Sequence, residues 1–159
     1  LQGMDRMELM ISANKGESLK PLAKIASGGE LSRIMLALKC VIADKDSIPT
    51  MIFDEIDTGV SGRAAQKIGI KLSELGSVRQ VLCVTHLSQI GIMAENHLKI
   101  EKHQENGRTS TKVTTLDFEG RVYEIGRIMC GEPPSELILK SAREELIRQH
   151  PQFAKENEN

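Results

Sequence analysis

Two adjacent carboxylates, Asp54 and Glu55, directly follow the apolar residues 51–53. An uninterrupted apolar run predicts a strand that is buried on both faces, as in a parallel sheet covered by helices. Ligands of such sheets bind just beyond the carboxyl ends of the strands. The pair therefore lies where chemistry is expected. The same two residues could instead merely end the strand and cap the next helix, and this stretch alone does not decide between the two interpretations.

A second apolar run, residues 81–84, stops at Thr85 and His86. A glycine-rich turn and a helical pattern separate the two runs, which predicts a right-handed βαβ unit with parallel strands. Neighbouring strands lie about 5 Å apart and end at the same edge. We therefore expect His86 to approach Asp54 and Glu55. A lone histidine is more often structural, but one at the matching end of a neighbouring strand is a better candidate for function.

The tetrapeptide Ser27, Gly28, Gly29 and Glu30 precedes a strong helical pattern. Apolar residues follow it at helical spacing, at positions Leu31, Ile34, Met35, Leu38, Val41 and Ile42. Ser27 and Glu30 have the spacing of a capping box, which is a purely structural interpretation. Capping does not explain the two glycines, which disfavour helix but permit close approach to the backbone. Because N–H groups at a helix start bind phosphate, we favour a phosphate contact here.

The remaining elements predict an α/β domain. Alternation over residues 6–12 indicates a strand, followed by a turn at residues 14–16. Asn106 and Gly107 indicate a tight turn, so we expect an exposed antiparallel hairpin at the sheet edge. Two helices are expected over residues 121–129 and 135–147. We assign residues 1–150 to one lobe and expect a disordered tail over residues 151–159.

Composition limits the classes of partner. The 159 residues are 40% hydrophobic and 27% charged, and 21 basic against 22 acidic side chains give a net charge of −1. This balance offers no electrostatic case for nucleic acid or an anionic membrane as a partner of this segment. The three cysteines are far apart, which excludes a CxxC zinc pattern and fits a reducing compartment. No leader or long apolar span is evident, and we expect a cytoplasmic location.

Together, the three candidate sites supply parts needed to transfer a phosphoryl group to water. That reaction needs a held metal, a positioned water and donors to the γ-phosphate. In this interpretation Asp54 coordinates Mg²⁺, Glu55 polarises the attacking water and His86 contacts the γ-phosphate. The pattern G-x-x-x-x-G-K-[ST] is absent from the sequence, so no P-loop cradles the β-phosphate of ATP.

These motifs resemble those of ABC-type ATPases. The stretch from Ser27 to Glu30 resembles the signature motif, residues 51–55 resemble the Walker B strand with its catalytic glutamate, and residues 57–62 and His86 resemble the D-loop and the switch histidine.

Three longer stretches are more specific. Residues 25–39, 52–62 and 84–90 resemble the RecN family of bacterial DNA double-strand-break repair ATPases, which are related to SMC proteins. The resemblance implies the C-terminal part of an ABC/SMC-type ATPase head, with a parallel sheet core flanked by helices and an antiparallel edge hairpin. It implies ATP and Mg²⁺ as cofactors.

The resemblance also implies roles for individual residues. Glu55 and His86 would be catalytic, and Asp54 would hold the metal. The nucleotide would be contacted by the signature motif and the D-loop, at Ser27, Gly28, Gly29, Glu30 and Asp57.

The implied partners are the N-terminal P-loop half of the same protein, a second head in an ATP-dependent homodimer, and DNA through the full-length protein, which would be nucleoid-associated when acting on DNA. No membrane partner is implied. The isolated chain, lacking a P-loop, is expected to be inactive. The alternative is a non-catalytic dimerisation or interaction module with an ABC-like fold, although such a module has no need for Glu55 or His86.

Overall fold

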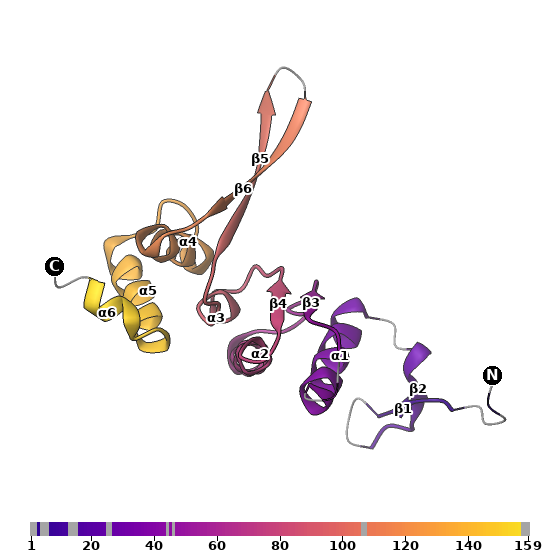
Figure 1. Ribbon diagram of the computed structural model, residues 1–159. Helices are drawn as coiled ribbons and strands as arrows, with labels where there is room; N and C mark the ends of the chain where they lie inside the picture. Colours follow the sequence, from indigo (N-terminus) through magenta and orange to yellow (C-terminus); the bar gives the residue numbers. More distant parts are fainter. Residues whose placement is uncertain are drawn as a thin grey trace.

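The computed structural model describes residues 3, 7–12, 16–24, 27–43, 45, 47–105 and 108–156. Its centre is a pair of parallel strands, β3 (Thr50–Phe53) and β4 (Gln80–Cys83), in the register Thr50 to Gln80. Helix α2 (Gly62–Gly76) connects them. The predicted βαβ unit is therefore confirmed, and the chain is an α/β structure (Figure 1).

Only one face of the β3–β4 pair is covered within the part of the chain that the structure describes. Met51 and Phe53 point into a core formed with α1 (Gly28–Ile42) and α2. Ile52, on the opposite face, is 70% exposed, and Leu82 and Val84 are exposed as well. The prediction of a strand buried on both faces is thus wrong for this chain, because both helices pack against the same side.

Helix α1 is confirmed, but its predicted apolar stripe is not the side that it buries. The helix faces α2 and the strands with Leu36 and the half-buried Cys40. Leu31, Met35 and Leu38 lie on the exposed side. Apolar residues therefore occupy two sides of α1, and only one has a partner among the described residues.

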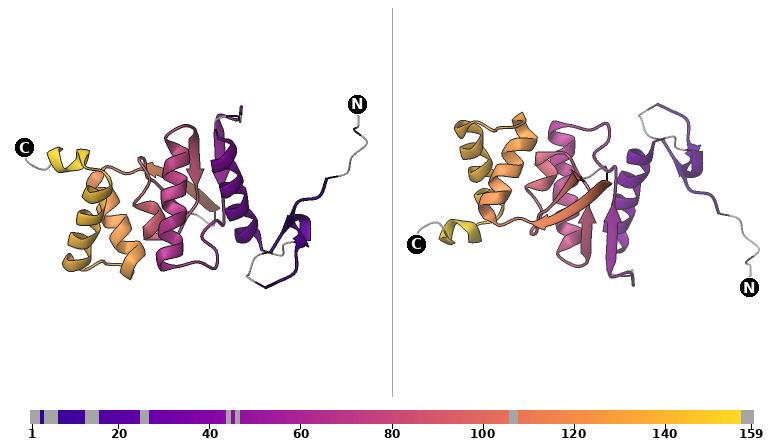
Figure 2. Two further views of the ribbon diagram at one scale, coloured as in Figure 1. Left: turned by 90° about the horizontal axis from the view of Figure 1, so that it is seen from below. Right: turned by 90° about the horizontal axis from the view of Figure 1, so that it is seen from above.

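A second core joins the C-terminal helices. It comprises the buried side chains Ile92, Val122, Ile125, Ala142 and Leu146. The elements around it are α3 (Ser88–Gly91), α4 (Phe118–Cys130) and α5 (Glu136–Gln149). Figure 2 shows α1, α2, α4 and α5 standing in a row along the molecule.

The expected antiparallel hairpin forms from β5 (Leu98–Glu105) and β6 (Arg108–Thr115). It is a two-stranded sheet of its own and projects from the body (Figure 1), so in the described chain it is not an edge of the β3–β4 sheet. Its predicted turn residues, Asn106 and Gly107, lie outside the described residues.

The N-terminal strand is shorter than predicted within the part of the chain that the structure describes. The predicted strand over residues 6–12 is reduced to β1 (Met10–Ile11), which pairs with β2 (Lys20–Pro21) and precedes the short 3-10 helix η1 (Leu22–Lys24). The first two residues of the predicted turn at residues 14–16 lie outside the described residues.

Within the predicted tail, Gln152–Glu156 form helix α6, and residues 157–159 lie outside the described residues. The Phe153 ring lies 4.9 Å from the Phe118 ring, centroid to centroid, and the Arg121 guanidinium lies 5.1 Å from the Phe153 centroid. An aromatic anchor therefore fixes part of the tail. No helix in the described ranges is long and apolar enough to cross a membrane.

Two leucines on α5 test the second core. Leu146 is fully buried, whereas Leu137 is 76% exposed. We expect Leu146→Ala to lower the free energy of unfolding by about 2–5 kcal/mol, because the change removes buried contacts and leaves a cavity. Leu137→Ala is the matched control and should change it by less than about 0.5 kcal/mol. Urea unfolding measures both, and equal effects of the two substitutions would contradict the assigned core.

Candidate functional site

The carboxyl ends of β3 and β4 meet through hydrogen bonds. The Val84 amide donates to the Phe53 carbonyl at 2.9 Å, which extends the strand pairing by one residue. Beyond that point, Oδ2 of Asp57 accepts hydrogen bonds from the Thr85 hydroxyl at 2.6 Å and from the His86 amide at 2.9 Å. Nδ1 of His86 also lies 3.0 Å from this oxygen. The two strand ends converge as predicted, but the carboxylate that meets His86 is Asp57.

Asp57 and His86 differ sharply in exposure. The Asp57 side chain is 3% exposed, whereas that of His86 is 73% exposed. Burial raises the pKa of Asp57, but the hydrogen bonds from Thr85 and the His86 amide, together with the nearby His86 ring, lower it by more. The net pKa lies below the ordinary aspartate value, so Asp57 is a buried anion held by its donors.

The start of α1 is bound to the loop that follows β3. The Ser32 hydroxyl donates to the Asp54 carbonyl at 2.9 Å. Nη1 of Arg33 donates to the carbonyls of Ile56 and Thr58, at 3.1 and 2.9 Å. The sequence pattern was not used to predict these contacts of Ser32 and Arg33. Polar residues within a strongly apolar helical pattern are nevertheless a signal for such contacts.

The two glycines of the tetrapeptide have different surroundings. A Cβ at Gly29 would lie 2.9 Å from the Glu55 carbonyl oxygen, which is fixed backbone, so close packing of α1 against the loop explains this glycine. A Cβ at Gly28 would lie 2.6 Å from Oε2 of Glu55, the end of a flexible side chain. Gly28 is exposed. Packing alone therefore does not require glycine at this position.

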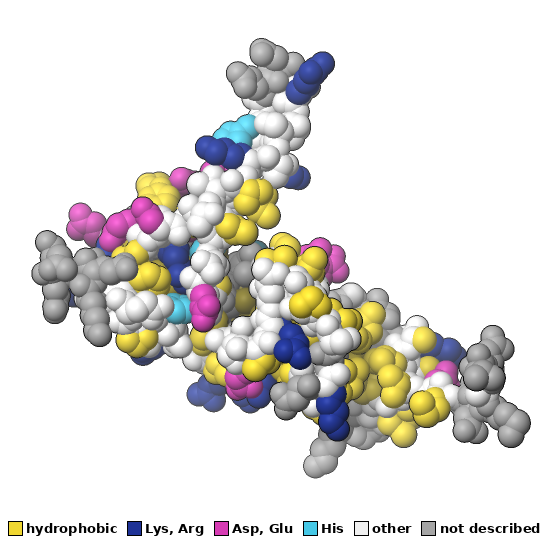
Figure 3. All heavy atoms as spheres, viewed as in Figure 1, with side chains coloured by type: hydrophobic (Ala, Val, Ile, Leu, Met, Phe, Trp, Pro, Cys, Tyr) yellow, Lys and Arg dark blue, Asp and Glu magenta, His cyan; other side chains and the backbone are white. Residues whose placement is uncertain are grey.

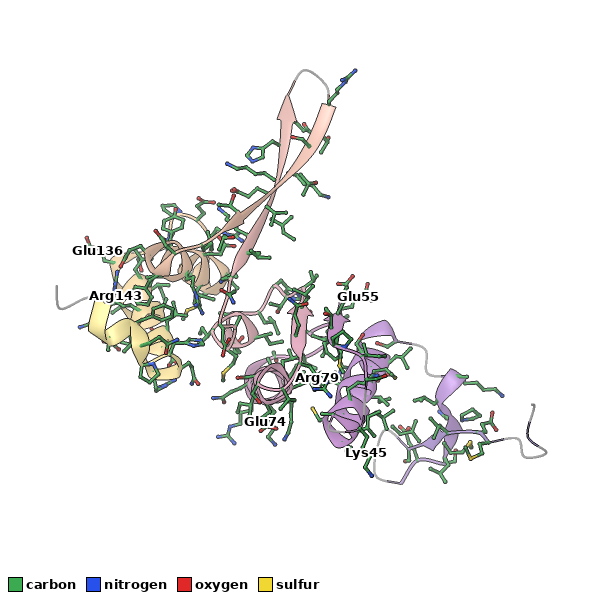
Figure 4. The ribbon with its side chains drawn as sticks, in the orientation of Figure 1. Lys45, Glu55, Glu74, Arg79, Glu136 and Arg143 are labelled. Carbon is green, nitrogen blue, oxygen red and sulfur yellow. The ribbon has the colours of Figure 1, made fainter. Side chains whose placement is uncertain are left out.

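Glu55 lies at the junction of these elements. Its backbone has φ 56°, in the left-handed region that non-glycine residues seldom adopt. Figure 4 shows its side chain extending beyond the end of β3 beside the start of α1. Strained residues held by surrounding structure cluster at functional sites, which supports a role for Glu55 beyond ending the strand.

Ser27 caps α1, because its Oγ accepts a hydrogen bond from the Glu30 amide at 3.4 Å. This confirms one half of the predicted capping box. Ser27 is half-buried and Gly29 is buried, whereas Gly28 and Glu30 are exposed, so solvent reaches the tetrapeptide at Gly28 and Glu30.

Asp54 is a suitable ligand for Mg²⁺. It is exposed, and its Oδ1 accepts a hydrogen bond from the Glu55 amide at 2.9 Å. The part of the chain that the structure describes contains no group of three or more His, Cys, Asp or Glu side chains arranged to hold a metal. One carboxylate is nevertheless compatible with Mg²⁺, which is usually bound through one or two carboxylates together with water and substrate phosphates.

Substitution of the two glycines tests which of them the packing of α1 against the loop requires. We expect Gly29→Ala to destabilise the chain by about 1–3 kcal/mol, because its methyl group meets backbone. Gly28→Ala should cost less, since the Glu55 side chain can move aside. Thermal and urea unfolding of both variants checks this. A larger loss for Gly28→Ala would contradict the packing described above.

Stability should depend on the ionisation of Asp57. Because its pKa is lower in the folded chain than the ordinary value of about 3.9, the anion stabilises the fold above that pH, and this contribution is lost as the pH falls through the folded pKa. We expect Asp57→Asn to be less stable than the wild type at pH 7, with the difference narrowing below about pH 4. Urea unfolding at several pH values measures this, and a difference that does not change with pH would contradict it.

Comparison with known proteins gives close relatives. A search of protein-family models gives no match. The chain is 47% identical over 148 residues to the DNA repair protein RecN of Bacillus subtilis, a match that covers 93% of the chain and 26% of that protein. It is 48% identical over 144 residues to RecN of Halalkalibacterium halodurans and 46% identical over 144 residues to RecN of Deinococcus radiodurans.

One similar solved structure comes from work on ATP-driven dimerization and DNA-stimulated activation of SMC ATPases. It has 22% sequence identity and a TM-score of 0.47, and the match covers 66% of this chain and 62% of that one. The sequence relatives are much closer, and the chain spans about a quarter of their length. With this identity over nine-tenths of its residues, the chain is similar to a segment of RecN proteins that spans about a quarter of their length.

Proposed function

We propose that the chain is the C-terminal half of an SMC-like ATPase head, which hydrolyses ATP at a head–head interface during DNA double-strand-break repair and recombination. One observation carries this proposal. The exposed start of α1, the strained Glu55 and the exposed His86 ring gather at one end of the β3–β4 pair, around the loop that holds Asp54 and Asp57. The relatives that are similar to this chain in sequence are DNA repair proteins.

In this proposal each exposed group has a distinct task. Glu55 accepts a proton from the attacking water or orients it, for which a carboxylate at a rigid strand end is suited. His86 donates to the oxygens of the γ-phosphate. Asp54 holds Mg²⁺, which neutralises charge on the phosphates when it is bound.

The tetrapeptide faces a nucleotide held by a second head. Ser27 caps the Glu30 amide, whereas the amides of Gly28 and Gly29 in the first turn of α1 lack intrahelical partners, and such groups bind phosphate. Exposed Gly28 admits a ligand close to the backbone. The family resemblance also assigns Asp57 to the nucleotide, although its burial makes direct contact difficult.

The ATP site is incomplete within this chain. The sequence contains no P-loop. Apolar residues on α1 and on the β3–β4 pair are exposed and are not covered by any described residue. In Figure 3 hydrophobic side chains gather along the upper side of the body and at the base of the hairpin. We propose that the N-terminal P-loop half of the same protein covers part of this surface, and that the chain alone does not turn over ATP.

DNA contact belongs to the full-length protein, because the near-neutral charge of this segment provides no general attraction for phosphate backbones. We propose a cytoplasmic protein that associates with the nucleoid when it acts on DNA.

The second candidate function is a non-catalytic interaction module. The exposed apolar surface favours it, since such patches mark interaction sites. It predicts association with a partner that is independent of nucleotide, whereas the ATPase proposal predicts head pairing that requires ATP. Analytical ultracentrifugation of the full-length protein with and without ATP distinguishes the two.

Substitution of Glu55 tests the catalytic assignment in the full-length protein that carries this segment. We expect Glu55→Gln to lower the ATP turnover rate by about 100-fold or more, because the amide cannot accept the proton, while ATP binding is retained. Steady-state hydrolysis and equilibrium nucleotide binding measure the two properties.

The matched control is Glu74→Gln on α2. Glu74 is an exposed glutamate that pairs with Lys71 at 2.5 Å and lies away from Glu55 (Figure 4). Its replacement should leave turnover unchanged. Turnover by Glu55→Gln at the wild-type rate would overturn the role assigned to Glu55.

A further inference from the structure

Three groups approach one oxygen of Asp57, and two of them donate hydrogen bonds to it. They are the Thr85 hydroxyl, the His86 amide and the His86 ring nitrogen Nδ1, at 2.6, 2.9 and 3.0 Å. The acceptor is buried, whereas the ring is mostly exposed. The buried Asp57 carboxylate thus lies beside Nδ1 of the exposed His86 ring, at the site where the ring is proposed to contact phosphate.

The hydrogen positions follow from the partners. The Thr85 hydroxyl accepts a hydrogen bond from the Leu87 amide at 3.1 Å, so its single hydrogen is directed to Asp57. An ionised carboxylate can only accept, so the 3.0 Å approach of Nδ1 of His86 favours a hydrogen on that nitrogen. Nε2 is then the nitrogen that can reach a substrate, and it donates to a phosphate oxygen when the ring is protonated and both nitrogens carry a hydrogen.

The acceptor is itself anchored. Ile56, the preceding residue, is fully buried in the first core, and its carbonyl accepts from Arg33 of α1. The Asp57 carbonyl accepts from the Val60 amide at 3.3 Å. The position of Asp57 is therefore set by the core and by the start of α1, and its hydrogen bonds with Thr85 and the His86 amide place the His86 ring relative to it.

We propose that Asp57 and Thr85 are positioning residues, which hold the His86 ring with Nδ1 toward Asp57, so that Nε2 of the protonated ring faces the γ-phosphate and donates to it. This inference rests on the proposed function and changes it in one respect, since Asp57 acts through His86 and does not contact the nucleotide. Thr85, for which no separate role was predicted, orients the carboxylate.

The test is a double-mutant cycle for ATP hydrolysis in the full-length protein that carries this segment. Thr85→Val removes the hydroxyl while keeping the shape of the side chain, and we expect kcat to fall by roughly tenfold with little change in KM. Thr85→Ser restores the hydroxyl and should restore kcat. On the His86→Ala background, Thr85→Val should have no further effect, because its route to the substrate is already lost.

The outcomes separate the two proposals. If His86→Ala lowers kcat but the losses from His86→Ala and Thr85→Val multiply, Thr85 acts independently and the positioning role is overturned, while the proposed function stands. If His86→Ala leaves kcat unchanged, the role of His86 in the proposed function fails, and the positioning role fails with it.

A measurement that does not depend on turnover is ¹⁵N NMR of histidine side chains, with the His86 signal identified by its loss in His86→Ala. The neutral ring should carry its hydrogen on Nδ1 in the wild type and in Thr85→Ser. Asp57→Asn should shift the population toward hydrogen on Nε2, the commoner form of a ring without such a partner. A wild-type ring with its hydrogen on Nε2 would overturn the inference even if the cycle gave the expected result.

Discussion

The loop between β3 and α2 is held on two sides, and the geometry of the site depends on this constraint. On one side, Ser32 and Arg33 of α1 donate to its backbone carbonyls, and Gly29 allows the helix to approach within contact of the Glu55 carbonyl. On the other side, the buried Asp57 carboxylate joins the loop to the end of β4 through Thr85 and His86. A buried carboxylate without donors would be costly, so these contacts form as a set.

The same constraint links elements that are far apart in the chain. The tetrapeptide at the start of α1, the carboxylates after β3 and the histidine after β4 become neighbours because one short loop touches all three. Movement of α1 relative to the strands would disturb the Arg33 contacts first and the Asp57 position next. The start of α1 is therefore mechanically connected, through this loop, to His86.

The apolar side chains of the β3–β4 pair are buried on one face of the pair and exposed on the other. The first core lies on one side of the β3–β4 pair, and apolar side chains remain exposed on the other side and on α1. The second core is attached through α3 and by Arg121, whose buried guanidinium donates to the carbonyls of Ala94 and Glu95. Exposed apolar surface on otherwise regular elements is expected for a segment that spans a quarter of its relatives.

Features encoded by neighbouring residues could be predicted from the sequence alone. Helical spacing identified α1 and α2, the Ser27 cap followed from its distance to Glu30, and two apolar runs around a helix specified a parallel βαβ unit. These predictions succeeded because capping, periodicity and the pairing of sequential strands depend on local geometry. The motif order also identified the family resemblance, which rests on residue identity and needs no coordinates.

Only the tertiary structure decided which sides are buried and which carboxylate meets the histidine. Periodicity shows that α1 has apolar sides but not which one finds a partner, since that depends on where α2 and the strands lie. Asp54, Glu55 and Asp57 all follow β3, and the sequence pattern does not show which carboxylate points inward. The turn after β3 directs only Asp57 inward, where it accepts a hydrogen bond from His86, 29 residues later. Contacts over that separation are fixed by the path of the backbone, which short-range patterns do not contain.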